Sequence, residues 1–373
     1  MKAKSTITFF TAVFFFSTYL YGQVFSDKVV SEERIELVDS IADEPYPYLL
    51  PIWGKKVIEK GFDIPYSAGL GINYVTQESE ILVQNLQVGF NNGELIELDE
   101  FIRFPSAVAT STVINFRPDI WVFPFLNVYG VLARTNSSTA IDAVLTLPNQ
   151  DGFEDIFDFS TKVEFEGSTV GFGLTPTIGV AGGWIALDMN FSWSDINELE
   201  DPVYTFVFGP RIGKTFHFRR PDQNIAVWVG AFRVDIKNET SGSLPFSEIF
   251  DFDGSLQEKI DDGMQAVVTK QQELDDWFNA LSPPQQVVNR PKYEAATTIL
   301  GAANNFLFRL EDAGQRIADS SVQYNIDKRQ KNLWNMVVGG QYQFNKNLMV
   351  RAEFGFLGER TQFIGGLQYR FRL

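Results

Sequence analysis

The chain has 373 residues, no cysteine and a formal net charge of −16 at pH 7. The absence of cysteine excludes disulfides, thiolate metal sites and cysteine nucleophiles. The acidic balance argues against a nucleic-acid partner, because binding to nucleic acid needs basic stripes that neutralise phosphates. Aromatic residues make up 14% of the chain and include 35 Phe. Such a content suits a barrel that contacts lipid and its interfaces.

The first 22 residues have the three parts of a secretory signal. Lys2 and Lys4 form a charged start, and an apolar run follows at 7–21. The run ends at the small residue Gly22. It is shorter than the ~20 residues that a membrane-spanning helix requires. We therefore expect 1–22 to be a signal peptide that is removed on export.

Residues 23–65 predict an N-terminal segment with one short helix. Pro51 begins a helix candidate that runs to Lys60, and Gly61 follows it with normal stop chemistry. The apolar residues around it, such as Leu49 and Trp53, favour burial. The segment is therefore either a periplasmic lead-in or a small plug in the lumen.

Residues 66–237 alternate between apolar and polar side chains, as a strand with two different faces requires. In the clearest case, Ile185, Leu187 and Met189 alternate with Asp188 and Asn190. Segments of about 10 residues match the ~9–11 that cross a bilayer when tilted, whereas soluble sandwich strands are nearer 5–6 residues. The segments are 66–74, 82–90, 114–117, 126–132, 141–147, 163–165, 170–180, 185–193, 204–212 and 226–236, with turn clusters at 91–93, 136–138, 149–152 and 221–224.

Residues 238–332 interrupt the alternation and predict a pair of helices. A capping box at 255–258 precedes apolar residues that recur at helical spacing up to Phe278. Pro283 and the next proline are expected to stop this helix, and a second helix is expected over about 292–322. The sequence thus predicts an α-helical hairpin inserted between two strands.

Residues 333–373 return to strand alternation and carry a family resemblance. Three strands are expected here, at 334–344, 348–356 and 362–373. The terminal GGLQYRFRL resembles the C-terminal assembly signal of bacterial outer-membrane β-barrels, although that signal usually ends in an aromatic residue and this chain ends in Leu373. The resemblance implies insertion by the barrel assembly machinery, and it assigns no catalytic or binding residue.

Together, the alternation and the export signal predict an all-β transmembrane antiparallel barrel of the porin-like class in the bacterial outer membrane. Ten strand segments precede the helical insert and three follow it. Closed single-chain bacterial barrels have an even number of strands. We therefore expect about 12 strands if 160–180 is one bent strand. The alternative is 14 strands, if the chain has one strand that the alternation does not reveal. In barrels of this class the last strand ends at the periplasm, so the resemblance implies an extracellular position for the hairpin, which precedes the last three strands.

Charged residues at the polar positions are expected to face the lumen, because a charge facing lipid at mid-bilayer costs ~2–4 kcal/mol. Such side chains suit either a permeation path or a polar network that packs the interior. The candidates for lumen-facing residues are Asp188, Arg211, His217, Arg233, Asp235, Arg351, Glu353, Arg370 and Arg372.

Signals for catalysis are weak. His217 is the only histidine, and the nearby Arg219 and Arg220 are basic, whereas a hydrolytic histidine needs an acid or hydroxyl partner. A single histidine without cysteine does not suit a transition-metal site, and no nucleotide-binding glycine motif occurs. We therefore expect no enzyme and no cofactor, with a barrel hydrolase as a formal alternative.

The sequence favours a narrow or plugged pore for small solutes. The alternative is a membrane-anchored surface or structural protein that acts through its extracellular helical insert. The expected partners are outer-membrane lipids, the barrel assembly machinery and small solutes.

Overall fold

The computed structural model describes residues 48–59, 64–149, 152–197, 199, 201–220, 222–236, 239–250 and 254–373. The expected signal peptide at 1–22 and the adjoining residues 23–47 lie outside this part of the chain. No helix in the described part is both long and apolar enough to span a membrane.

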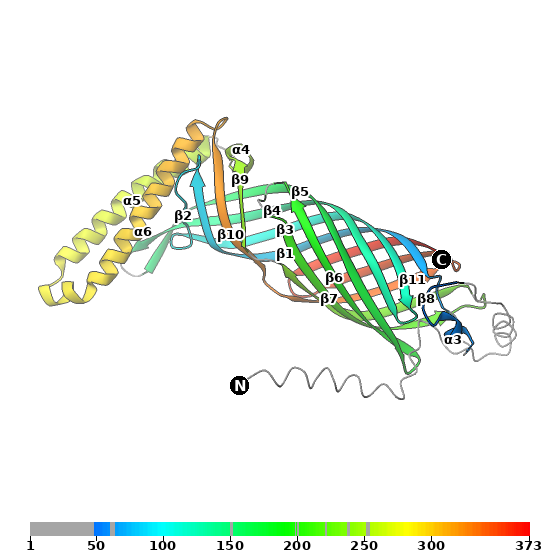
Figure 1. Cartoon of the computed structure of the whole chain (residues 1–373). Helices are drawn as coiled ribbons and strands as arrows, with labels where there is room; N and C mark the ends of the chain where they lie inside the picture. Colours follow the sequence, from blue (N-terminus) through cyan, green and yellow to red (C-terminus); the bar gives the residue numbers. More distant parts are fainter. Residues whose placement is uncertain are drawn as a thin grey trace, which may run out of the picture.

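Ten antiparallel strands close into a barrel (Figure 1). Neighbours around the wall follow the order β13-β12-β11-β8-β7-β6-β5-β4-β3-β1, and β1 pairs with β13 to complete the ring. The strands are β1 Ala68–Phe90, β3 Ile102–Phe123, β4 Leu126–Asn149, β5 Gly152–Val180, β6 Gly183–Ile196, β7 Val203–His217, β8 Asn224–Ile236, β11 Trp334–Gln343, β12 Leu348–Phe356 and β13 Arg360–Phe371.

The expected count of 12–14 strands is wrong, because two further apolar segments continue longer strands: 82–90 belongs to β1 and 141–147 to β4. The expectation that 160–180 is one strand is confirmed by β5, which is 29 residues long. The polar cluster 136–138, interpreted as a turn, lies inside β4 and pairs with both β3 and β5. Apolar residues recur in the far part of each strand after a polar stretch, so a gap in the periodicity does not mark a turn.

The outer face of the barrel carries a belt of apolar side chains. On β5, the exposed fractions of Val170, Phe172 and Ile178 are 59%, 46% and 44%. Lys162 and Glu164 occupy the same face of β5 farther along the strand. The apolar part of the strand therefore spans 170–180, which fits the ~9–11 residues of a tilted membrane-crossing strand. Exposed apolar side chains in such a continuous belt indicate contact with lipid.

Three large aromatic rings point into the barrel, each directly opposite a glycine on the neighbouring strand. A Cβ atom on any of these glycines would overlap the ring, so glycine is what allows each ring to lie against the wall. The rings help to fill the interior of a ten-stranded barrel, which is slightly wider than one of eight strands. The pairs are Tyr129 with Gly173, Trp184 with Gly213 and Trp228 with Gly339.

One side of the barrel wall extends beyond the apolar belt and forms a head. The head comprises the far ends of β1, β3, β4 and β5 together with β2 (Ile96–Glu97), β9 (Glu239–Pro245), β10 (Ser321–Gln330) and three helices. β10 pairs with the far half of β1, and β9 pairs with β10. Apolar residues from these strands share one buried core with the helices, so in the head they contact protein and not lipid.

The helices α5 (Gly254–Ala280) and α6 (Pro283–Gln315) form a hairpin, preceded by the short α4 (Phe246–Ile249). The prolines at 283 and 284 begin α6 and do not merely stop α5, so the second helix starts well before the expected residue 292. Proline suits the first helical turn because its missing N–H has no partner there. Ser282 and Gln285 complete a capping box at this end.

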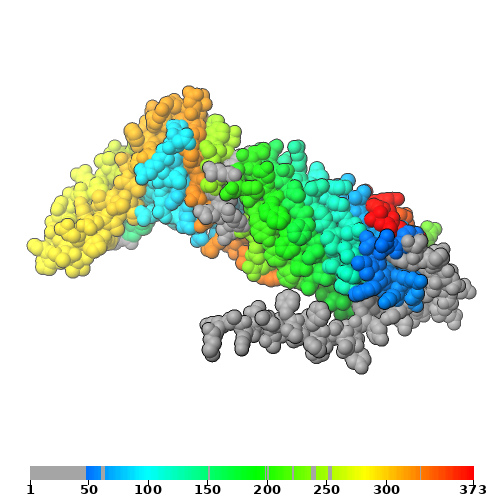
Figure 2. Space-filling view, in the orientation of Figure 1, coloured from blue at the N-terminus to red at the C-terminus, as the bar shows by residue number. Residues whose placement is uncertain are grey.

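The hairpin packs its base on the head and projects away from the barrel (Figures 1 and 2). Ile260 of α5 and Leu307 of α6 are completely buried against the head, as are Phe101 and Leu145 from the strand side. The hairpin lies between β9 and β10 in the chain. It therefore precedes the last three barrel strands, β11 to β13.

The described N-terminal residues lie at the opposite end of the barrel, near the C-terminus (Figure 1). Here α3 (Gly54–Ile58) follows Trp53, whose ring centroid is 5.1 Å from that of Phe123. The Ile52 amide donates a hydrogen bond to the Val122 carbonyl at 2.9 Å. Ile52 and Trp53 are nevertheless 42% and 55% exposed, in contrast to the expected burial. We call this end of the barrel the terminal end.

Candidate functional site in the barrel lumen

The centre of the lumen is crossed by hydrogen bonds to the Glu353 carboxylate, whose side chain is 2% exposed. Arg211 on β7 donates from Nε and Nη2 to its two oxygens, both at 2.9 Å. Trp228 Nε1 on β8 and Arg351 Nη2 on β12 donate to Glu353 Oε2 at 2.8 and 3.0 Å. Two charge-assisted bonds in parallel are the strong form of this interaction. The Glu353 carboxylate and its donors therefore form a buried, hydrogen-bonded cluster inside the lumen.

Asp188 on β6 extends this network to the other side of the barrel. Its Oδ1 accepts hydrogen bonds from the Tyr129 hydroxyl at 2.8 Å and from Thr175 Oγ1 at 2.7 Å. Its Oδ2 lies 3.5 Å from Arg211 Nη1. Arg211 therefore bridges two carboxylates, which satisfies both charges within a poorly solvated interior.

A second buried ion pair lies in the lumen nearer the terminal end. Arg370 Nη2 donates to Asp119 Oδ1 at 2.7 Å, and their side chains are only 7% and 1% exposed. Asn127 Nδ2 donates to the same oxygen at 2.7 Å, and Arg370 Nη1 donates to the Tyr66 carbonyl at 2.9 Å. With Gln368 Nε2, which donates to Asp119 Oδ2, Asp119 is the acceptor for three side chains, one from β4 and two from β13.

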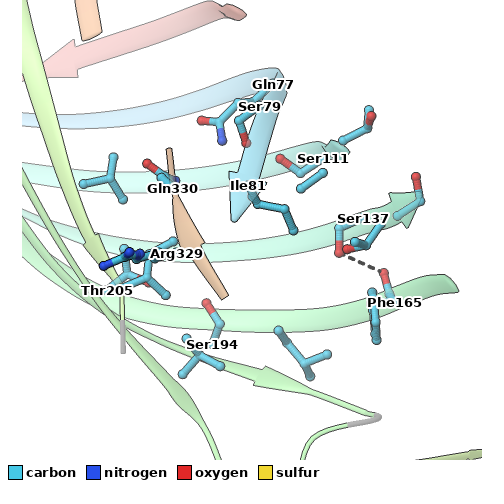
Figure 3. Close-up of a pocket in the computed structure, with 18 of the residues that line it drawn as sticks. Gln77, Ser79, Ile81, Ser111, Ser137, Phe165, Ser194, Thr205, Arg329 and Gln330 are labelled. Carbon is cyan, nitrogen blue, oxygen red and sulfur yellow. Dashed lines mark hydrogen bonds between the residues drawn. The ribbon is translucent and has the colours of Figure 1, made fainter. Parts of the chain in front are cut away.

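Residues in the described part of the chain line two spaces in the lumen. The larger, which we call the head-side cavity, has a volume of about 680 Å³ and is lined by polar residues including Gln77, Ser111, Ser194 and Arg329 (Figure 3). The smaller, which we call the terminal chamber, has a volume of about 110 Å³. The two spaces have no lining residue in common. The lining residues of the terminal chamber are Arg117, Trp121, Asn127, Thr175, Thr177, Trp184, Ala186, Asp188, Arg211, Ala226, Trp228, Gln341, Arg351, Gln368 and Arg370.

Five of the nine candidates for lumen-facing residues take part in the two ion-pair networks. Four of them lie in the Glu353 network, and Arg370 pairs with Asp119. For all five, the alternation in the sequence predicts a side chain on the lumen face of its strand. The four in the Glu353 network are Asp188, Arg211, Arg351 and Glu353 itself.

Arg233 and Asp235 do not face the lumen, contrary to the expectation. Arg233 is directly opposite Phe208 on one side and Trp334 on the other, and both rings lie on the outer face. Asp235 is two residues farther along the same face and forms an ion pair with Arg233 at 2.9 Å. The adjacent Phe232 is buried on the lumen side. The expected phase is therefore wrong for the whole of β8, because Ala226 and Trp228, also expected on the lipid face, are buried on the lumen side as well.

His217 and Arg372 lie at strand ends, outside the Glu353 network. His217 is the last residue of β7, opposite Asn224. Arg372 lies beyond the end of β13, where its Nη1 donates to the Tyr48 hydroxyl at 2.9 Å and its guanidinium is 4.6 Å from the centroid of the Tyr66 ring.

Sequence reasoning missed several residues of the lumen. Arg117 and Asp119 share the inward phase of β3, so the alternation of that strand contained a signal for both. The sequence contains no such signal for Tyr129 and Trp228, because aromatic residues are expected on the lipid face of a strand. In the described part of the chain, no group of three or more His, Cys, Asp or Glu side chains could hold a metal ion.

A closed barrel satisfies every strand's hydrogen-bonding edge, which is a requirement for any sheet that spans a membrane. This chain combines such closure with an apolar belt on the outer face. The protein is therefore a transmembrane β-barrel of the bacterial outer-membrane class, as the sequence predicted.

Comparison with known proteins places the chain near other outer-membrane barrels and gives no subfamily. Neither a family model nor a curated protein matches it. The translocator domain of the autotransporter NalP from Neisseria meningitidis is 8% identical with a TM-score of 0.31, covering 91% of this chain and 94% of that one. The β domain of the Bordetella autotransporter BrkA is 8% identical with a TM-score of 0.29, covering 82% and 100%. An outer membrane channel from Pseudomonas putida is 9% identical with a TM-score of 0.26, covering 82% and 96%. Likenesses at this level assign no function to the chain.

Proposed function

We propose that this protein is a gated outer-membrane channel for a small solute, with the Glu353 network as the gate. The observation that carries the proposal is the position of this network between the head-side cavity and the terminal chamber. A barrel that served only as an anchor would need no space on both sides of a barrier. The gate residues Arg211 and Glu353 come from β7 and β12, which are not neighbours in the wall.

The orientation of the channel follows from the last strand. In outer-membrane barrels with this kind of assembly signal, the C-terminal strand ends at the periplasm. The terminal end of the barrel then faces the periplasm, and the head and its helical hairpin face the outside. In this orientation, a solute enters the head-side cavity first and meets the Glu353 network before it reaches the terminal chamber.

The gate is expected to stay closed most of the time. Separation of Arg211 from Glu353 would leave a buried carboxylate and a buried guanidinium without their main partners, which is costly in a low-dielectric interior. Opening therefore requires a solute that replaces these contacts, or a variant that removes them. Purified protein in a planar bilayer should show little conductance.

A paired substitution tests the gate without leaving a single unpaired charge. We expect Arg211→Ala combined with Glu353→Ala to raise the conductance clearly above that of the wild type, because it removes both side chains of the barrier. The matched control is Arg233→Ala with Asp235→Ala, an ion pair of the same charges on the outer face. The control should behave like the wild type. If the gate variant and the control both fold and both show negligible conductance, the Glu353 network is not a gate.

A second candidate function has its own support. The hairpin projects from the head, and Val287 and Val288 near the start of α6 are 73% and 77% exposed. Exposed apolar side chains of this kind are frequent at surfaces that bind another protein. If neither the wild type nor the gate variant conducts, the barrel is an anchor and the hairpin becomes the functional part.

A further inference from the structure

We propose that the terminal chamber binds a small oxyanion, a carboxylate or a phosphate group, between Arg117, Arg351 and Thr177. The inference rests on the proposed channel only for its role in solute passage, since binding can be measured without conductance. All three residues line the chamber. Each has a buried polar atom without a hydrogen-bond partner in the described part of the chain.

The Arg117 guanidinium stacks on an aromatic ring, and no carboxylate in the described part of the chain forms an ion pair with it. Its guanidinium carbon lies 3.6 Å from the centroid of the Tyr129 ring. Stacking on a ring face uses the plane of the guanidinium and leaves the N–H donors along its edge free. The buried Nε atom has no hydrogen-bond partner among the described residues. The Tyr129 hydroxyl donates its own hydrogen to Asp188 at 2.8 Å.

Arg351 repeats this arrangement from another strand. Its guanidinium carbon is 4.9 Å from the centroid of the Trp228 ring, and only Nη2 is used, in the bond to Glu353. Its Nε is also buried without a partner in the described residues. The chamber therefore contains two guanidinium groups on aromatic supports, each with donors to spare. Such forks match the geometry of carboxylate and phosphate oxygens.

Thr177 supplies the independent observation. Its side chain is 1% exposed, and the described residues offer no hydrogen-bond partner for its hydroxyl. A buried hydroxyl without a partner is destabilising and rare in native proteins. Because the hydroxyl can donate, an anion oxygen in the chamber would satisfy it together with the two arginines.

Charge and size agree with this ligand class. Four arginines line the chamber, and Asp188 is the only carboxylate among the lining residues. The chamber volume of about 110 Å³ is several times the roughly 10–15 Å³ that one water requires. A small oxyanion fits this space and offsets the single positive charge that remains when Asp188, Glu353 and Asp119 are set against the four arginines.

Binding can be tested by isothermal titration of the folded full-length barrel in detergent, with sodium phosphate and sodium acetate as probes at constant ionic strength. We expect saturable binding of one anion per chain, with the stronger probe identifying phosphate or carboxylate as the preferred group. Arg117→Gln should weaken it by about tenfold or more, because a hydrogen bond from a charged donor is lost. Arg134→Gln on the outer face of β4 is the matched control and should bind like the wild type.

Thr177→Val adds a second variant that should remain folded, because it removes a hydroxyl that lacks a protein partner. We expect weaker anion binding without loss of stability in anion-free buffer. Absence of saturable binding of either probe to the wild type would overturn the proposal. Equal affinities of Arg117→Gln and Arg134→Gln would also overturn it. Conductance of the Arg211 and Glu353 double variant is measured separately, so failure of the gate and failure of the anion site are distinguishable.

Discussion

Glu353 shows how a single residue holds the lumen together. Its carboxylate accepts hydrogen bonds from Arg211, Arg351 and Trp228, and its side chain is almost inaccessible. Removal of one member of a buried ion-pair network leaves uncompensated charge, and this is usually more damaging than removal of the whole network.

We predict that Glu353→Ala destabilises the folded barrel by about 3–5 kcal/mol, because two arginines lose their main acceptor. Urea unfolding in lipid vesicles, followed by tryptophan fluorescence, measures the change. Asp235→Ala is the comparison, because its ion pair with Arg233 is about 40% exposed and should contribute below ~1 kcal/mol. Similar losses for the two variants would contradict the prediction.

The glycine opposite each inward ring provides another test at the residue scale. Gly173→Ala places a methyl group where the Tyr129 ring lies, so we predict a loss of about 1–3 kcal/mol from overpacking. Gly301→Ala in α6 has open space around its Cβ and should stabilise the helix by up to about 1 kcal/mol. Urea unfolding compares both. A neutral Gly173→Ala would mean that the ring has room to move.

At the scale of elements, a charged side chain links the helical hairpin to a strand of the head. Lys270 Nζ on α5 lies 2.8 Å from Glu154 Oε2 on β5 and 3.0 Å from Glu273 Oε2 on its own helix. Hydrogen bonds to these carboxylates raise the pKa of Lys270 above its ordinary value of 10.5. The hydrogen bond from Lys270 lowers the pKa of Glu154 below its ordinary 4.5.

These shifts predict how docking of α5 on β5 depends on pH. The lowered pKa of Glu154 means that its contribution is present above about pH 4.5 and is lost as the pH falls through the lowered value. The raised pKa of Lys270 means that its contribution is present below about pH 10.5 and is lost as the pH rises through the raised value.

Docking should therefore be tightest between these limits. Because the chain has no native cysteine, two introduced cysteines, one on α5 and one on β5, can carry spin labels at defined positions. Distances between the labels should lengthen or broaden at either pH extreme. Lys270→Met should abolish this pH dependence, and an unchanged profile in that variant would rule out the ion pair as its cause.

At the scale of the whole molecule, barrel closure and the helical hairpin are structurally independent. The strand pairs that close the ring, including β1 with β13, involve no residue of α5 or α6. The hairpin covers the apolar core of the head, where Phe101, Leu145 and Leu147 are completely buried.

We predict that replacement of residues 254–315 by a short flexible linker leaves a folded barrel. Its migration on gels should still change on heating, as expected for an intact transmembrane barrel. The exposed head core should bind a hydrophobic dye more strongly than the wild type does, because its apolar side chains lose their cover. Loss of heat-modifiable migration would mean that the hairpin is needed to form the barrel.

Much of the fold was predictable because lipid imposes a simple rule on a strand. One face must be apolar for about ten residues, and the pattern around Ile185 and Met189 follows that rule in the sequence itself. The number of strands was not predictable, because apolar residues recur at the far ends of β1, β4 and β5 after a polar stretch that resembles a turn. In the head, helices and a second sheet bury one face of these strands, so protein replaces lipid as the apolar environment.

For the candidate site, sequence alone determined which side of a strand most charged residues take, as for Asp188 and Glu353, because lipid excludes charge from the outer face. Tertiary structure decided which of them meet. Arg211 and Glu353 are 142 residues apart in the chain, and the pairing of β8 with β11 brings β7 and β12 close enough for their side chains to meet at 2.9 Å. Tertiary packing also turned Phe232 inward and Arg233 outward, because a lumen of this width needs large rings to fill it.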